Sequence, residues 1–340
     1  MSGQPYERDP NAPLTDLSVS RIKVVDKCSL AFKYTYVDRI PAASESASML
    51  FGNVVHDGVD EWYQAGHGGR DLAPLFTALW GKYLPKPIWT ATERCLAADR
   101  ELDALAEAIK ISRPQLKAPR QTKDFLESPE FARFEDLREA MLKKCEAEEA
   151  LRWPKDENPL QAYRKSMAIA AQMQARWQHL PAPVVVEAPF LLQFEGFNVK
   201  GRIDQIRLDP DDHGQPKPVE LLDIKTGRQP LSQMDAFIQA FLYTEACYTN
   251  PDLPDPDHVT FWLARHDRPQ HGRVDRERHK KLALRILNNV GRTIITGAWE
   301  PHYGMWCKSC DFAEMCEGEI GLWPVGEDTL ILDPTEAVAA

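Results

Sequence analysis

The chain has 340 residues, of which 43% are hydrophobic, and its 41 Lys and Arg against 51 Asp and Glu give a formal net charge of −10. This length predicts two domains, or one large domain with an insertion, and the hydrophobic content excludes a wholly disordered chain. No apolar run is long enough to span a membrane, and the polar N-terminus lacks the apolar core of a signal peptide, so we expect no membrane partner.

The negative charge is concentrated near the C-terminus. Residues 311–340 contain eight acidic residues and no Lys or Arg, so residues 1–310 hold 43 acidic and 41 basic residues, a net charge of −2. Basic residues gather in two stretches, 110–123 and 273–292, and a solvated helix face is the simplest interpretation of either stretch alone. The overall acidity therefore does not exclude DNA, and we expect the acidic end to lie away from any bound DNA.

The first half of the chain is predicted to be helical. Residues 1–16 are expected to form a flexible leader, and Ser18 or Ser20 can cap a helix that continues to Phe32. Apolar residues at helical spacing predict a second helix over 46–64. Segment 71–180 is rich in Ala, Glu, Lys, Arg, Leu and Gln and is punctuated by Pro, which predicts a helical subdomain or insertion.

The composition changes at residue 181, where strands are predicted. Their expected ranges are 184–193, 197–208 and 219–226, which together form a three-stranded meander. A helix over 231–248, a strand over 259–264 and a helix over 276–296 follow. This order predicts an α/β fold with a mixed central sheet flanked by helices.

Two carboxylates and a lysine lie on adjacent predicted strands. Asp223 and Lys225 are two residues apart, so they point to the same face of one strand, and Asp204 is on the neighbouring strand. Carboxylate oxygens beside a fixed cation suit Mg²⁺ or Mn²⁺ and the hydrolysis of a phosphate ester. A partly exposed strand with alternating charges would give the same Asp-x-Lys pattern, but a charge within so apolar a strand requires a partner or a function.

Three of the seven cysteines are clustered near the C-terminus. The spacing Cys307-x2-Cys310-x5-Cys316 suits a metal site, and an odd number of cysteines without a secretion signal does not suggest disulfides. A tetrahedral metal ion or an iron–sulfur cluster needs a fourth thiolate. Four cysteines remain as candidates for this ligand: Cys28, Cys95, Cys145 and Cys247.

Further motifs occur in a fixed order along the chain. They are Leu17-Ser-Val-Ser-Arg21 with Cys28, Phe51-Gly52-x3-His56, Glu187, Gly201-Arg-Ile-Asp204, Asp223-Ile-Lys225-Thr226, Gln239-x3-Tyr243 and the three C-terminal cysteines. In this order the chain resembles the PD-(D/E)xK nuclease superfamily, in particular its RecB-like branch with an iron–sulfur cluster, which includes CRISPR-associated and phage-encoded exonucleases. The resemblance spans about residues 17–320 but does not cover 71–180.

The resemblance implies a restriction-endonuclease-like fold and a role for each matching residue. The implied metal ligands are His56, Asp204, Asp223 and the backbone of Ile224; the implied catalytic group is Lys225 with Asp223, Asp204 and Glu187. Implied DNA contacts are Gln239, Tyr243, Arg21, Arg202 and Thr226, and implied cluster ligands are Cys28, Cys307, Cys310 and Cys316. By spacing alone, His56 would instead be a packed core residue, and Gln239 and Tyr243 two residues of an amphipathic helix. Asp57 and Asp60 receive no role.

The resemblance also implies an organisation and an activity. The expected segments are N-terminal core helices over 17–70, the helical insertion over 71–180, the nuclease core over 181–300, the cluster region over 301–322 and an acidic tail over 323–340. The expected activity is a Mg²⁺- or Mn²⁺-dependent deoxyribonuclease with a [4Fe–4S] cluster, for which Zn²⁺ is the alternative. It would act as an exonuclease on single-stranded DNA or DNA ends.

Two interpretations of the function compete. A nuclease would work in the cytoplasm of a bacterial, archaeal or phage-infected cell, with recombination, replication or CRISPR-adaptation proteins as partners. A non-catalytic DNA-end-binding or adaptor protein on a nuclease scaffold is the alternative, although such a protein would have no chemical need for Asp204, Asp223, Lys225 and His56 together. No helicase phosphate-binding loop occurs in the sequence.

Overall fold

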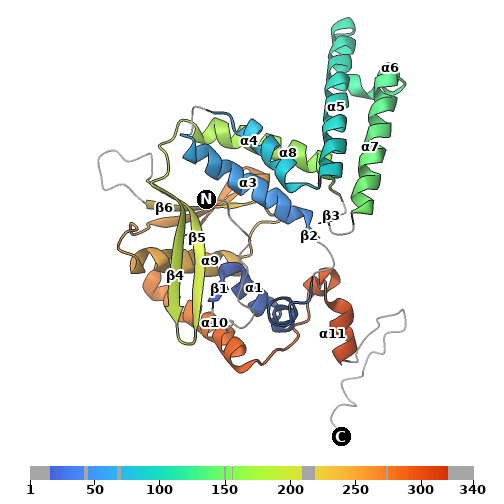
Figure 1. Cartoon of the computed structure of the whole chain (residues 1–340). Coiled ribbons are helices and arrows are strands. Elements are labelled where there is room, and N and C mark those ends of the chain that lie inside the picture. The colour runs from blue at the N-terminus through green and yellow to red at the C-terminus, as the bar shows by residue number, and fades with distance from the viewer. Residues whose placement is uncertain are drawn as a thin grey trace.

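The computed structural model describes residues 16–41, 45–66, 70–148, 151–154, 156–208, 219–272 and 275–320. A mixed six-stranded sheet lies at its centre, and helices cover both faces (Figure 1). The path of the sheet runs through β1 (Asp16–Ser18), β5 (Phe197–Leu208), β6 (Val219–Lys225), β7 (His258–Leu263) and β8 (Arg268–Gly272), while β4 (Val185–Phe194) pairs with β5. This architecture confirms the expected α/β class with a mixed central sheet.

Strand β5 organises the sheet because it has three partners. Along one edge it pairs antiparallel with β4. Its other edge is shared between β1, which pairs in parallel with 198–200, and β6, which pairs antiparallel with 205–208. Residues 201–204 have no strand partner on that second edge in the described sheet, so the sheet opens there.

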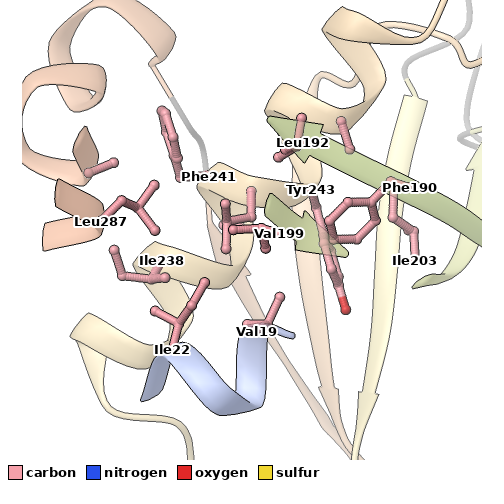
Figure 2. Close-up of a cluster of buried hydrophobic side chains, with 14 of the residues drawn as sticks. Val19, Ile22, Phe190, Leu192, Val199, Ile203, Ile238, Phe241, Tyr243 and Leu287 are labelled. Carbon is pink, nitrogen blue, oxygen red and sulfur yellow. The ribbon is translucent and has the colours of Figure 1, made fainter. Parts of the chain in front are cut away.

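One face of the sheet is covered by α1 (Val19–Lys27), α9 (Gln233–Thr249) and α10 (Arg276–Thr296). Figure 2 shows the core between these helices and strands β4 and β5, in which Ile22, Leu287 and Phe241 lie on one side of Val199 and Phe190 lies beside Tyr243. Ser18 caps α1 by accepting the N–H of Arg21, as the sequence predicts. The predicted N-terminal helix is, however, interrupted at Cys28, after which come α2 (Ser29–Phe32) and a π-helical turn (Lys33–Val37).

The opposite face is covered by α3 (Ala47–Gln64), α4 (Leu72–Tyr83) and α8 (Pro159–Trp177). Side chains alternate across β6, so Leu221 packs in the first core, whereas Leu222 and Ile224 pack against this second group of helices. The alternation explains why β6 reads as a continuous apolar run, since both of its faces are covered.

A helical arm projects from this second layer (Figure 1). It consists of α5 (Lys86–Ser112), a 3-10 turn (Pro119–Gln121), α6 (Lys123–Leu126) and α7 (Pro129–Ala147), which enclose a small core of their own. The predicted helical character of 71–180 is therefore confirmed, apart from the two-residue strand β3 (Leu151–Arg152), which pairs with β2 (Glu45–Ser46). The expected division into subdomains remains a prediction.

The remaining elements lie after β7. They are a 3-10 turn (Ala264–His266), a second 3-10 turn (Met305–Ser309) and α11 (Ala313–Ile320). The expected flexible leader and the acidic tail fall almost entirely outside the described residues.

Candidate active site

Asp204 and Asp223 face each other where β5 and β6 separate. The last paired residues of these strands are Gln205 and Leu222, and the two carboxylates occupy the next position on each strand. The Oδ2 atom of Asp204 accepts a hydrogen bond from the backbone N–H of Ile224 at 2.8 Å. At this point a side-chain hydrogen bond therefore replaces the backbone hydrogen bonds between the two strands. The opening of the sheet is therefore lined by the two carboxylates that the sequence singled out.

Asp223 is held by three polar groups, and its side chain is only 2% exposed. Its Oδ1 atom accepts hydrogen bonds from Nε2 of Gln239 at 2.7 Å and from the hydroxyl of Tyr243 at 2.8 Å. Its Oδ2 atom lies 2.6 Å from Nζ of Lys225. Burial raises the pKa of Asp223, and the charge of Asp204 adds to this rise, while Lys225 opposes it.

Helix α9 supplies the two hydrogen-bond donors to Asp223. Gln239 and Tyr243 are four residues apart and share one face of the helix, as their spacing predicts, and Gln239 also donates to the Tyr243 hydroxyl at 2.8 Å. The Oε1 atom of Gln239 accepts a hydrogen bond from Nζ of Lys23 at 3.1 Å. Burial lowers the pKa of Lys23, and the nearby charge of Lys225 lowers it further. No sequence motif indicated Lys23.

Helix α3 brings a histidine and a third carboxylate to the same opening. The Nδ1 atom of His56 lies 3.3 Å from Oδ2 of Asp204. Burial disfavours the charged imidazole, but the charge and hydrogen bond of Asp204 raise the pKa of His56 to about 9. Asp60 lies one turn further along, and burial, together with the charges of Glu187 and Asp204, raises its pKa to about 8. No role was predicted for Asp60 from the sequence, although its four-residue spacing from His56 places both side chains on one helix face.

Glu187 lies opposite Asp204 across β4 and β5. The pairs Val186 with Gln205 and Ala188 with Ile203 flank this position, at which the pairing is interrupted. Glu187 has φ of +53°, a left-handed conformation that is costly for a residue with a side chain. Burial raises the pKa of Glu187, and the charge of Asp204 contributes to the rise.

The remaining predicted DNA contacts lie at different distances from this centre. Arg202 is exposed on β5 and its guanidinium lies 3.5 Å from the Glu187 carboxylate. Thr226 follows Lys225, and its Oγ1 atom is so close to α3 that a Cβ atom on Gly52 would lie 3.2 Å from it. Arg21 is directed elsewhere: it donates to the backbone oxygen of Asp16 and its guanidinium lies 4.7 Å from the Tyr36 ring centroid. The structure thus groups Arg202 and Thr226 with the carboxylates, but not Arg21.

The donor set at the opening fits a hard divalent cation. The Oδ2 atom of Asp223 is buried and accepts no hydrogen bond of normal geometry from the described residues, despite its proximity to Lys225. A carboxylate oxygen in that state is a suitable ligand for Mg²⁺ or Mn²⁺, and Asp204 supplies a second carboxylate beside it. Within the described ranges, no three His, Cys, Asp or Glu side chains are already grouped as a set of metal ligands.

The four cysteines of the expected cluster line one cavity of about 720 Å³. Cys28 comes from the end of α1, and the other three, Cys307, Cys310 and Cys316, come from the C-terminal segment. The remaining cysteines lie elsewhere: Cys95 in the core of the arm, Cys145 against the second core and Cys247 within the first core. The geometry therefore separates Cys28 from the other three candidates for the fourth thiolate.

Hydrogen bonds next to this cavity join the N-terminal helices to the C-terminal segment. Ser29 Oγ donates to the backbone oxygen of Glu300 at 2.9 Å and accepts the N–H of Glu300 at 2.8 Å. The N–H of Leu30 donates to the same oxygen at 3.2 Å. These bonds fix α2 to the segment that precedes the C-terminal cysteines.

The chain belongs to the PD-(D/E)XK nuclease superfamily, whose family model matches residues 16–317. No curated protein matches it. Among solved structures, a protein from Eubacterium rectale named "Putative exonuclease" is similar at 12% identity and a TM-score of 0.40, over 100% of this chain and 99% of that one. A second structure, of SSO0001, is similar at 14% identity and a TM-score of 0.27, over 66% of this chain and 97% of that one.

The family membership identifies the chain as a nuclease by class. Nucleases of this superfamily typically use divalent metal ions such as Mg²⁺ or Mn²⁺, and the donor set described above fits such an ion. No helix in the described part of the chain combines the length and the apolar character needed to cross a lipid bilayer.

Proposed function

We propose that this chain is a Mg²⁺- or Mn²⁺-dependent deoxyribonuclease that removes nucleotides from single-stranded DNA or from DNA ends. The observation that carries the proposal is the buried carboxylate of Asp223, which is bound by Gln239, Tyr243 and Lys225 beside Asp204. Desolvated carboxylates next to a lysine are costly to bury, and an active site explains why they are retained.

Asp204, Asp223 and His56 would hold the metal, with the backbone carbonyl of Ile224 as a further ligand. When bound, the metal supplies Lewis-acid polarisation of the scissile phosphate and lowers the pKa of a water molecule. Lys225 orients that water and stabilises the negative charge that develops on the phosphate. Gln239 and Tyr243 fix the orientation of Asp223 by hydrogen bonds to Oδ1, which leaves Oδ2 directed toward Lys225.

Glu187, Arg202 and Thr226 are proposed to act around this centre. Glu187 faces Asp204 and would orient water molecules near the metal, while Arg202 and the Thr226 hydroxyl would contact phosphate groups of the substrate strand. For Arg21 we propose a phosphate contact at the start of α1, outside the carboxylate group. Gln239 and Tyr243 are also proposed to contact DNA, and of the proposed DNA contacts they are the two that bind Asp223 directly.

Cleavage of labelled DNA tests the activity. The parent protein is expected to release terminal nucleotides from linear single-stranded DNA with Mg²⁺ or Mn²⁺ but to leave circular single-stranded DNA intact. Lys225→Ala and Asp223→Asn are expected to lose activity by about 100-fold or more, the range for removal of an acid–base or charge-stabilising group. Lys143→Ala, which changes an exposed lysine of α7, is the matched control and should cleave like the parent.

The outcomes of this assay separate the alternatives. Metal-dependent cleavage of circular DNA would show that the protein is an endonuclease, because circular DNA has no ends for an exonuclease. DNA binding without cleavage of any substrate would favour the non-catalytic DNA-end-binding or adaptor protein. Cleavage that is unchanged in Lys225→Ala and Asp223→Asn would refute the assignment of the site.

A [4Fe–4S] cluster bound by Cys28, Cys307, Cys310 and Cys316 is the second part of the proposal. The shared cavity of the four cysteines and the hydrogen bonds between α2 and Glu300 support it, because a cluster there would join both ends of the nuclease fold. Four thiolates also suit Zn²⁺, which is the alternative occupant.

Anaerobic purification distinguishes the two occupants. We expect a brown protein with broad absorption near ~400 nm and stoichiometric iron and sulfide. Cys28→Ser should lose this absorption, whereas Cys145→Ser, which changes a partly buried cysteine outside the cavity, should retain it. A colourless protein with bound zinc would show that the site holds zinc and not the cluster.

Participation in recombination, repair, phage replication or CRISPR adaptation, and a cytoplasmic location, are part of the same proposal.

A further inference from the structure

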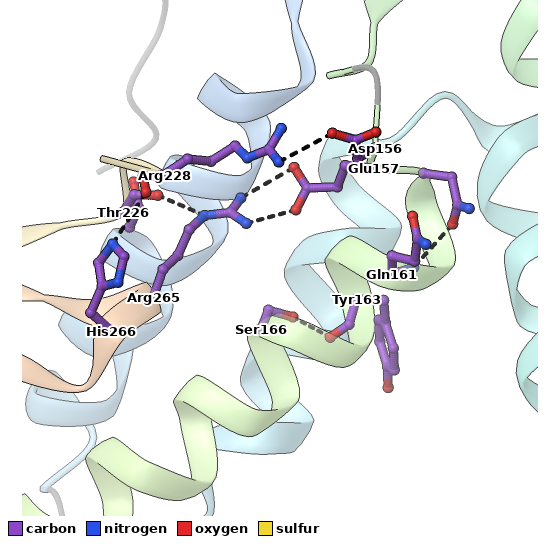
Figure 3. Close-up of polar contacts among 10 residues, drawn as sticks. Asp156, Glu157, Gln161, Tyr163, Ser166, Thr226, Arg228, Arg265 and His266 are labelled. Carbon is purple, nitrogen blue, oxygen red and sulfur yellow. Dashed lines mark hydrogen bonds and ion pairs between the residues drawn. The ribbon is translucent and has the colours of Figure 1, made fainter. Parts of the chain in front are cut away.

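Arg265 connects three parts of the molecule through one buried side chain (Figure 3). It lies in the 3-10 turn after β7, and its side chain is 9% exposed. Its Nε atom donates to the backbone oxygen of Thr226 at 2.9 Å, and its two terminal nitrogens lie 2.6 and 3.4 Å from the carboxylate oxygens of Glu157. The guanidinium carbon is 3.8 Å from the centroid of the Phe51 ring.

Each of these contacts reaches an element that carries the proposed active site or supports it. Thr226 directly follows Lys225 at the end of β6, and Phe51 precedes His56 on α3 by little more than one turn. At Gly52 the helix and the end of β6 approach so closely that a Cβ atom would lie 3.2 Å from Thr226 Oγ1. Arg265 therefore holds the end of β6 against the helix that carries the histidine.

The third contact comes from the helical insertion. Glu157 lies in the turn before α8, its carboxylate is 10% exposed, and its backbone N–H is bound to the oxygen of Pro154 at 3.0 Å. A buried ion pair is weak evidence for stability, because an apolar pair of similar volume is often as stable, whereas loss of one partner leaves an unpaired charge. The pair nevertheless keeps a planar donor group directed at the Thr226 carbonyl, which no apolar side chain could do.

A neighbouring ion pair provides an internal comparison. Arg228 and Asp156 lie 3.8 Å apart with side chains that are 47% and 77% exposed. This pair joins the same turn before α8 to the loop after β6, whereas Arg265 reaches that turn from the 3-10 turn after β7; Figure 3 shows the two pairs side by side. Exposed pairs of this kind contribute little. The two pairs therefore share the turn before α8 but differ in burial and in the bond to the Thr226 carbonyl.

We propose that Arg265, bound to Glu157, is a positioning residue of the nuclease reaction: it fixes the end of β6 so that the Lys225 ammonium stays beside Asp223. This inference rests on the proposed function and adds to it a role for the helical insertion, which carries Glu157. The insertion thereby becomes part of the active-site support.

The test is to replace the buried pair by an apolar one. In the folded double variant Arg265→Met/Glu157→Leu, kcat is expected to fall by about tenfold or more, and KM is expected to stay within twofold of the parent. The upper limit of the fall in kcat is about 100-fold, which is the loss of rate when a reacting group is displaced by about 1 Å. The matched control Arg228→Met/Asp156→Leu should leave both constants unchanged. Arg265→Lys should not restore kcat, because an ammonium cannot donate to Thr226 and Glu157 with the same planar geometry.

A second readout does not depend on cleavage. After reductive ¹³C-methylation of the lysines, the NMR signal of Lys225, assigned by its loss in Lys225→Arg, should shift in Arg265→Met/Glu157→Leu and not in the control. If the parent cleaves no DNA, the proposed function fails, while this signal still decides whether Arg265 positions Lys225.

Specific results would overturn the inference. A folded double variant with the kcat of the parent and an unshifted Lys225 signal would show that the pair is only structural, and so would equal effects of the two double variants. If Arg265→Met/Glu157→Leu does not fold, Glu157→Gln, which retains an oxygen acceptor, takes its place. A shifted Lys225 signal in that folded variant supports positioning, and an unchanged signal refutes it.

Discussion

At the scale of single residues, Asp223 shows how an apolar strand can contain a carboxylate. Leu222 and Ile224 pack on one face of β6, whereas Asp223 points to the other face, where two donors of α9 meet it. The sequence indicated this residue because a charge interrupts an apolar run. Gln239 and Tyr243 were indicated only by the resemblance to the nuclease superfamily, as DNA contacts, because their four-residue spacing alone is equally typical of an amphipathic helix.

Other residues of the site have no such local signal. The left-handed backbone conformation of Glu187 could not be predicted from the sequence, because glutamate disfavours positive φ. Lys23 reaches Gln239 across 216 positions of the sequence, so only the tertiary fold brings the two side chains together. Asp60 could have been included, because its four-residue spacing from His56 places both side chains on one helix face, whereas Asp57 directly follows His56 and points in another direction.

Gly58 on α3 gives a prediction at this scale. Alanine normally stabilises a helix interior relative to glycine by about 1 kcal/mol, but a Cβ atom at position 58 would lie 2.4 Å from the Phe76 ring of α4. We therefore expect Gly58→Ala to lower the free energy of unfolding by about 1–3 kcal/mol, the range for overpacking a core. Chemical denaturation measures the change. The double variant Gly58→Ala/Phe76→Leu should recover part of it, and a more stable Gly58→Ala would contradict the packing described here.

At the scale of elements, local patterns predict the long helices and the meander but not the short strands. The helix over 276–296 matches α10, and the three predicted strands match β4, β5 and β6 within one or two residues. Strand β1 has only three residues and pairs with β5 about 180 positions later. Strand β8, with the sequence Arg-Pro-Gln-His-Gly, has no apolar alternation and exists as a strand because β7 lies beside it.

The β6–β7 pair predicts a dependence of stability on pH. Glu220 lies directly opposite His258, and although burial would raise its pKa, hydrogen bonds from His258 and Thr260 and nearby positive charge lower it below the usual value. A lowered pKa means that Glu220 stabilises the fold above the pKa of the unfolded chain, about 4.5, and that this contribution is lost as the pH falls through the folded value.

Denaturation between pH 3 and pH 7 checks this dependence. Glu220→Gln should lower the free energy of unfolding by about 1.5–3 kcal/mol at pH 7, as expected for loss of a hydrogen bond to a charged group, and the difference from the parent should shrink toward acidic pH. A constant difference across this range would mean that the charge of Glu220 does not contribute.

At the scale of the whole molecule, the two basic stretches differ in a way that composition does not reveal. In the stretch 110–123, Arg113, Arg120 and Lys123 form ion pairs with nearby acids. In the stretch 273–292, Arg276 is paired, but five exposed cations of α10 have no ion pair with any described residue: Arg278, Lys280, Lys281, Arg285 and Arg292. Without Lys280, their spacing of three, four and seven places the other four on one solvent-facing side of the helix, over about 21 Å.

This basic ridge of α10 (Arg278, Lys281, Arg285 and Arg292) is expected to contribute most of the salt dependence of DNA binding. The logarithm of the DNA-binding constant falls linearly with the logarithm of the salt concentration, by roughly 0.7 per phosphate contact for single strands. Replacing the four cations by Gln should therefore make this slope less steep by up to about 3. The control carries the same change in net charge at the ion-paired positions Arg113, Arg120, Lys123 and Arg133 and should keep the slope of the parent. Equal slopes for both variants would show that only net charge matters.

The hydrogen bonds between Ser29 and Glu300 have a consequence for the order in which the protein is made. Every proposed catalytic residue lies between His56 and Tyr243, so a nascent chain contains all of them before Glu300 has been synthesised. Until then α2 lacks the segment that fixes it, and the cysteines of the two ends cannot share a cavity. Translation therefore completes the proposed catalytic residues before the C-terminal segment that fixes α2. A chain that stops before Glu300 contains every proposed catalytic residue but lacks the Ser29–Glu300 hydrogen bonds and the C-terminal cysteines.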